Sequence, residues 1–81
     1  MPAVTLLAMA PDATATLSDG RRALMWMNPL SGDDCEWNIS IDGVWQPDVT
    51  TGWPYDRTEG AACALAALAH LGLSVASLEV A

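Results

Sequence analysis

A run of strong helix formers near the C-terminal end is the sequence feature that most constrains the fold. Ala61 to Leu71 consists largely of Ala and Leu, which have the highest helix propensities. Asp56, followed three residues later by Glu59, resembles a capping box with Asp56 as the N-cap. Gly72 follows the run and suits a left-handed C-cap. The pattern predicts one helix from about Arg57 to Leu71.

The predicted helix lacks a polar outer face. No charged residue occurs between Glu59 and Glu79, whereas a surface helix normally carries polar residues on one side. A dimer partner or the C-terminal tail could cover this second apolar face, or the small alanines are simply tolerated in water. The side facing the core is expected to contain Leu65, Leu68, Leu71, Ala61 and Ala64. The contact of a homodimer is expected near Ala62, Ala66 and Ala69.

Four segments upstream of the helix resemble β-strands. Val4 to Met9 is a short apolar run, and Ala13 to Leu17 leads into the turn signal Ser18-Asp19-Gly20. Arg22 to Asn28 is apolar on both faces, which is typical of a central strand. Glu36 to Ile41 has apolar residues at every second position, as expected of a half-buried strand.

The dipeptide Asp42-Gly43 marks a second hairpin with two conceivable registers. A two-residue turn pairs Ile41 with Val44 and places Trp45 on the polar face of the sheet. A three-residue loop with Gly43 in the left-handed conformation pairs Ile39 with Trp45, so that both lie on one apolar face. Because a slip of one residue moves every side chain to the other face, the pattern favours the second register.

The remaining segments complete the expected fold. Pro47 to Pro54 is expected to be irregular, and Ser74 to Ala81 to form a short final strand with Ala76, Leu78 and Val80 in alternation. The chain of 81 residues allows one domain, residues 1–81. We therefore expect an α+β fold: a small antiparallel sheet of about four strands packed by one C-terminal helix, with or without the short final strand.

Charge restricts the kinds of partner. The chain has ten acidic residues, three arginines and no lysine, and its net charge is −7. Phosphate binding requires clustered cations, so direct binding to nucleic acid or to an anionic membrane is not expected. Attraction to a basic protein surface is expected instead, unless the acidity only keeps the protein soluble.

No pattern typical of catalysis, a cofactor or a metal is found. The single histidine, His70, cannot build a typical zinc site, and no phosphate loop, nucleophile elbow or calcium loop occurs. Cys35 and Cys63 are expected to be free thiols in a reducing cytoplasm, with a Cys35–Cys63 bridge as the alternative. The apolar run Ala3 to Ala10 is short for a signal peptide and lacks a preceding cation. We expect a cytoplasmic protein that is not an enzyme and has no cofactor and no membrane span.

The candidate binding residues surround the middle hairpin. Asp33, Asp34 and Glu36 form an acidic cluster that is either a solvated loop or a contact for Arg or Lys of a partner. Trp53 is either an interface anchor or part of a lid over the core. The expected partner-binding residues are Asp33, Asp34, Glu36, Asp42, Asp48 and Trp53.

About half of the chain supports a resemblance. Gly43-Val44-Trp45 and the segment Tyr55 to Ala62 resemble small phage and bacterial proteins in which a hairpin precedes an Ala-rich helix. The short, acidic chain also resembles anti-CRISPR proteins in type, although no functional residue carries over. This second resemblance implies an acidic inhibitor that binds a CRISPR effector and blocks its nucleic-acid channel. The alternative is a small dimeric structural or adaptor protein that uses the Ala-rich helix as its interface.

Overall fold

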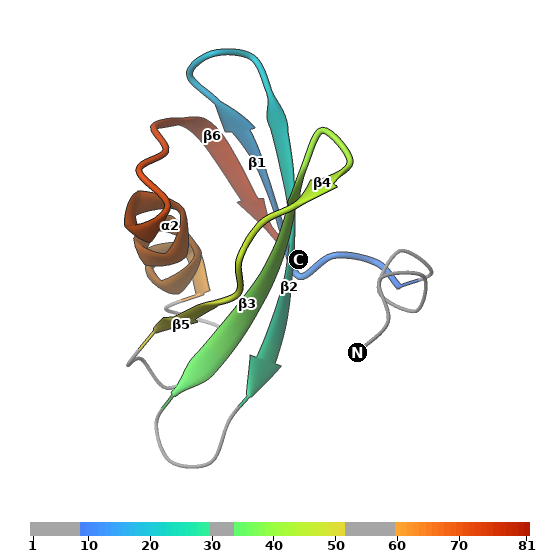
Figure 1. Cartoon of the computed structure of the whole chain (residues 1–81), viewed down its shortest axis with the longest axis vertical. Helices are drawn as coiled ribbons and strands as arrows, with labels where there is room; N and C mark the ends of the chain where they lie inside the picture. Colours follow the sequence, from blue (N-terminus) through green and yellow to red (C-terminus); the bar gives the residue numbers. More distant parts are fainter. Residues whose placement is uncertain (1–8, 30–33, 52–59) are drawn as a thin grey trace.

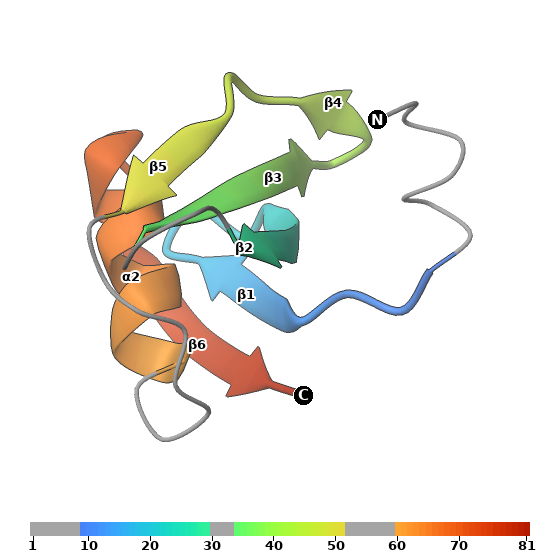
Figure 2. The same cartoon turned by 90° about the horizontal axis from the view of Figure 1, so that it is seen from below.

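An antiparallel sheet and a C-terminal helix pack against each other in two layers (Figures 1 and 2). The computed structural model describes residues 9–29, 34–51 and 60–81. Within these residues the elements are β1 (Ala13–Leu17), β2 (Arg22–Pro29), β3 (Cys35–Ile41), β4 (Val44–Trp45), β5 (Val49–Thr51), α2 (Gly60–His70) and β6 (Val75–Val80). The strand order is β4-β3-β2-β1-β6, and β5 also pairs with β3. The predicted α+β class, with one antiparallel sheet and one helix, is confirmed for the described part of the chain.

The predicted strands before the middle hairpin agree with the structure where it describes them. β1 and β2 form the expected hairpin, with Thr14 opposite Leu24. β2 lies between β1 and β3, so it is a central strand, as its two apolar faces indicate. The predicted strand Val4 to Met9 falls mostly outside the described residues, as does the predicted N-terminal cap of the helix.

The preferred register of the middle hairpin is wrong. Ile41 pairs with Val44 and Ser40 with Trp45, which is the two-residue turn. Asp42 and Gly43 both have positive φ, 49° and 83°, as a type I′ turn requires of its two central residues. On that face Trp45 packs beside Trp26, because the centroids of the two rings are 5.5 Å apart. The prediction failed because it treated the face that carries Ser40 as polar, whereas Trp26 of β2 makes this face apolar beside Trp45.

Two further segments differ from expectation. Val49–Thr51, predicted to be irregular, is strand β5, because Val49 is buried opposite Trp37 on β3. In β6 a shift of register opposite Thr16 and Leu17 interrupts the predicted alternation. Consequently Ala76 is exposed, while the apolar residues of β6 that pack against the core are Val75, Leu78 and Val80.

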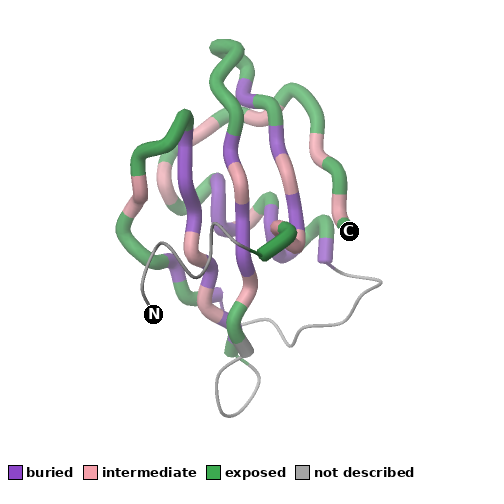
Figure 3. Tube along the Cα trace, turned by 90° about the vertical axis from the view of Figure 1, so that its right-hand side faces the viewer, coloured by how far each residue is buried: buried purple, intermediate pink, exposed green. Residues whose placement is uncertain are grey.

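The core lies between the sheet and the helix, as the alternation of buried and exposed positions along the strands shows (Figure 3). The sheet contributes the large side chains Met25, Trp37 and Ile39, all at most 1% exposed. The helix contributes mainly small residues, and its buried positions are Gly60, Cys63, Ala64, Ala67 and Leu68. Of the residues predicted to face the core, Ala64 and Leu68 are buried and Leu71 packs against the core. The prediction is wrong for Ala61 and Leu65, which are exposed, because the small residues Gly60, Cys63 and Ala67 meet the large side chains of the sheet instead.

The C-terminal end of α2 agrees with the sequence pattern. Gly72 has a φ of 76°, and its N–H donates to the carbonyl of Ala69 at 2.9 Å. The N–H of Leu73 donates to the carbonyl of Leu68 at 3.1 Å, which completes a Schellman motif. This cap turns the chain directly from the helix into β6.

The corrected helix face makes a prediction about stability. Leu68 is 0% exposed and Leu65 is 42% exposed, so the two leucines of one helix form a matched pair. We expect Leu68→Ala to lower the free energy of unfolding by about 2–5 kcal/mol, and Leu65→Ala to change it by less than about 0.5 kcal/mol. Urea unfolding of both variants measures this, and equal losses in the two would show that the helix is rotated from the described orientation.

Candidate functional site

The sheet face opposite α2 carries a pair of tryptophans, Trp26 on β2 and Trp45 on the outer strand β4. The rings of Trp26 and Trp45 are tilted by 41° at a centroid distance of 5.5 Å. Trp26 is only 3% exposed, and its indole Nε1 donates to the carbonyl of Met9 at 3.1 Å. Residues 9–12 leave β1 on the side of the sheet away from the helix (Figures 1 and 2). The chain therefore covers part of this second apolar face itself.

Three of the expected binding carboxylates follow one another along the first part of β3, where it pairs with β5. Glu36 is half-buried and pairs with Thr50 of β5, and Asp34 lies two residues before it, exposed. The Asp48 carboxylate accepts a hydrogen bond from Asn38 Nδ2 at 2.9 Å, which places it one step along the same face. We call Asp34, Glu36 and Asp48 the acidic edge.

The other expected binding residues do not join the acidic edge. Asp42 lies at the far end of β3, where its carboxylate accepts a hydrogen bond from the N–H of Arg22 at 3.1 Å. Six residue steps of extended chain, about 20 Å, separate Asp42 from Glu36. Asp33 and Trp53 lie outside the described residues.

The acidic edge is not neutralised by the described cations. Within residues 9–29, 34–51 and 60–81, the single ion pair joins Arg21 Nε to Asp19 at 2.7 Å, in the turn between β1 and β2. The hydrogen bond from the backbone N–H of Arg21, together with the Arg21 side chain, lowers the pKa of Asp19. No described Arg or His lies within ion-pair distance of the acidic edge.

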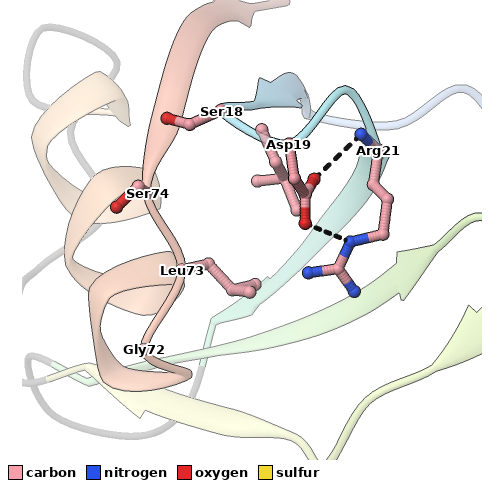
Figure 4. Close-up of a pocket in the computed structure, with 7 residues that line it drawn as sticks. Ser18, Asp19, Arg21, Gly72, Leu73 and Ser74 are labelled. Atoms are coloured by element: carbon pink, nitrogen blue, oxygen red, sulfur yellow. Dashed lines mark hydrogen bonds and ion pairs between the residues drawn. The ribbon is translucent and has the colours of Figure 1, made fainter.

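The turn that holds this ion pair also borders a small hollow (Figure 4). Its volume is about 210 Å³, and it lies between the β1–β2 turn and the connection from α2 to β6. Ligand pockets usually measure roughly 300–1,000 Å³. The cation that borders the hollow, Arg21, already pairs with Asp19. We therefore assign no ligand to the hollow, whose lining residues are Leu17, Ser18, Asp19, Arg21, Gly72, Leu73 and Ser74.

A buried polar cluster lies between the start of β3, the end of β5 and helix α2. Cys35 Sγ lies 3.2 Å from Cys63 Sγ, and Thr51 Oγ1 lies 3.0 Å from the first sulfur and 3.1 Å from the second. The indole Nε1 of Trp37 donates to Cys63 Sγ at 3.2 Å. Both cysteines are free thiols, and burial raises the pKa of Cys35. We call Cys35, Trp37, Thr51 and Cys63 the thiol cluster.

Sequence reasoning had no means of finding the thiol cluster, although it left a Cys35–Cys63 bridge open as an alternative. The two cysteines are 28 residues apart, and their approach depends on the packing of α2 against β3. Thr51 belongs to a segment that was predicted to be irregular. The alternation of β3 does predict that Trp37 is buried, and the structure confirms this.

The residues expected to mediate self-association lie on the outer side of α2. Ala62 and Ala69 are exposed and Ala66 is half-buried. Leu65, exposed to 42%, lies among them. The described part of this helix face is therefore apolar and open to solvent.

Comparison with known proteins adds no relative. No family model matches the chain, and neither a curated protein nor a solved structure matches it. In the part of the chain that the structure describes, no group of three or more His, Cys, Asp or Glu residues could hold a metal ion. None of the described helices is long and apolar enough to cross a membrane.

The thiol cluster predicts that stability declines at alkaline pH. Because burial raises the pKa of Cys35 above its ordinary value of 9.0, the folded chain holds this proton more tightly than the unfolded chain. The stabilisation is complete below about pH 9 and is lost as the pH rises through the raised pKa. Urea unfolding from neutral pH to about pH 10.5 should show the decline in wild type and a flatter profile in Cys35→Ala. An equally steep decline in Cys35→Ala would show that another titratable group causes the loss of stability.

Proposed function

We propose that this protein acts by binding, not by catalysis, and that the acidic edge is its contact with a cation-rich surface of another protein. The observation that carries the proposal is the succession of Asp34, Glu36 and Asp48 along the start of β3 without a described cation beside them. Glu36 lies on a strand paired on both sides, and Asn38 holds the Asp48 carboxylate. These two carboxylates need little reordering when they meet arginines or lysines, which reduces the entropic cost of binding.

Competition with nucleic acid is the mechanism that this charge distribution favours. A protein channel that holds DNA or RNA is lined with Lys and Arg, and a chain with a net charge of −7 is attracted to it over a range of about 8 Å at physiological ionic strength. We propose that the protein is an acidic inhibitor of a nucleic-acid-handling complex in the cytoplasm. The resemblance in type to anti-CRISPR proteins suggests a CRISPR effector as that complex.

A competition assay tests this proposal. Purified CRISPR effector ribonucleoproteins bound to fluorescent target DNA are titrated with the protein, and displacement of the DNA is followed by anisotropy. We expect the double variant Asp34→Asn/Glu36→Gln to bind roughly tenfold more weakly than wild type, because it removes two ion pairs of about 0–1 kcal/mol each. We also expect the association rate of wild type to fall as salt rises.

A matched double variant distinguishes the contribution of the acidic edge to binding from the contribution of net charge. Asp19→Asn/Glu79→Gln changes the net charge by the same amount, but on β6 and in the β1–β2 turn. It should bind within about twofold of wild type at physiological salt, because charges beyond a Debye length are screened. If both double variants weakened binding equally, net charge and not the acidic edge would explain the loss of affinity. Failure of wild type to displace nucleic acid from any effector would reject the inhibitor function.

The open helix face supports a second candidate function, a small dimeric structural or adaptor protein. Ala62, Leu65 and Ala69 are exposed on one side of α2, and an apolar surface of this kind is often buried in an interface.

Sedimentation at micromolar concentration tests the dimer. We expect a mass above the 8.5 kDa of the monomer for wild type, and the monomer mass for Ala62→Glu/Ala69→Glu, because two buried carboxylates cannot be accommodated without partners. A wild-type chain that sediments as a monomer would rule out this second function.

A further inference from the structure

The thiol cluster places two sulfur atoms almost within bonding distance inside the core. Cys35 Sγ and Cys63 Sγ are 3.2 Å apart, and a disulfide bond measures about 2.05 Å. An approach of about 1.2 Å between the two sulfur atoms would join them. Cys35 is 0% exposed and Cys63 is 1% exposed, so no solvent separates the thiols.

We propose that Cys35 and Cys63 are a modification site: a dithiol that a low-molecular-weight disulfide, such as oxidised glutathione, converts to an internal disulfide. The described neighbours fit both states. Trp37 Nε1 donates to Cys63 Sγ, and the sulfur of a disulfide can still accept this bond. Thr51 Oγ1 lies within hydrogen-bond distance of both sulfurs, so its hydroxyl can donate to either sulfur after the thiol protons are gone.

The chemistry is two steps of thiol–disulfide exchange. One cysteine loses its proton, and its thiolate attacks a sulfur of oxidised glutathione; the glutathione S–S bond breaks and one glutathione leaves as a thiolate. The second cysteine then loses its proton and attacks the cysteine sulfur of the mixed disulfide, which releases the second glutathione. The two cysteines together lose two electrons and two protons, and one glutathione disulfide becomes two glutathione thiols.

Burial selects the internal bond over other products. A glutathione adduct on Cys35 or Cys63 places a tripeptide between α2 and the sheet, where Ala64 and Leu68 are 0% exposed and leave no space. The neighbouring thiol, 3.2 Å away, removes the adduct at once. Because neither thiol is exposed, the first step requires a local opening of the helix from the sheet. Oxidation is therefore expected to be slow and to end in the Cys35–Cys63 bond.

The bond would connect the two layers of the fold. It joins β3 to α2 across a sequence separation of 28 residues, and the closed loop contains β4 and β5. In the chain-entropy account, a loop of this length limits the unfolded chain enough to raise the melting temperature on the order of 10 °C. The oxidised protein is thus expected to keep its fold and to be more stable.

The test uses the full chain in glutathione buffers of increasing oxidised fraction. Samples are quenched with acid, alkylated with N-ethylmaleimide and weighed intact. We expect a monomer that has lost two hydrogens and takes up no label, and that melts on the order of 10 °C higher than the reduced chain. Dithiothreitol should restore both labels and the original melting temperature. The single variants Cys35→Ala and Cys63→Ala should show no rise in melting temperature under oxidising buffer.

Three results would overturn the proposal. The first is a native chain that keeps two free thiols at excess oxidised glutathione, while the same chain unfolded in guanidinium is oxidised. The second is an end product that carries glutathione or links two chains. The third is an internal disulfide that lowers the melting temperature. The wild-type measurements decide between these results and the expected one, even if a cysteine variant does not fold.

Discussion

The close approach of helix α2 to the sheet is the contact on which the fold depends. The sheet presents large side chains to the helix, with Trp37 and Met25 fully buried. The helix contributes the small residues Cys63, Ala64 and Ala67 to this contact, and their small volumes let the helix backbone lie close to the side chains of Trp37 and Met25. Leu68 is the one large side chain that the helix inserts. An Ala-rich helix is therefore a requirement of this core, because a helix with large inner residues would be held away from Trp37.

The packing of small helix residues against large sheet residues also explains where the polar groups lie. Cys63 has a sulfur at the point where the Trp37 indole needs an acceptor, so the one donor of the ring is satisfied inside the core. The second pair of aromatic rings, Trp26 and Trp45, lies on the other face of the sheet and is partly covered by the chain near Met9. Glu36 lies on this second face, between Asn28 of β2 and Thr50 of β5, so its carboxylate does not enter the core. The acidic edge therefore lies outside the core, and changes to its carboxylates are expected to leave the packing intact.

Local sequence signals predicted the elements better than their contacts. The helix, its end at Gly72 and the central position of β2 follow from propensity, a left-handed glycine and a strand apolar on both faces. The hairpin at Asp42-Gly43 was predicted with the wrong register, because the partner of Trp45 is Trp26, which is distant in sequence. The exposure of Leu65 depends on which side of α2 meets the sheet, and no local pattern contains that information. For the candidate site, the sequence proposed the carboxylates but could not show that Asp34, Glu36 and Asp48 lie along the start of β3 while Asp42 lies at its far end.

The contact between Trp37 and Cys63 is the most direct test of this description. Nuclear magnetic resonance can follow the exchange of the Trp37 indole Nε1–H with solvent and its proximity to the Cys63 β protons. If α2 packs on the sheet, this proton exchanges only when the helix opens from the sheet or the whole chain unfolds, so its exchange is slow, and it shows a strong nuclear Overhauser effect to Cys63. An indole proton of Trp37 that exchanges as fast as that of a solvent-exposed tryptophan, with no effect to Cys63, would contradict the account.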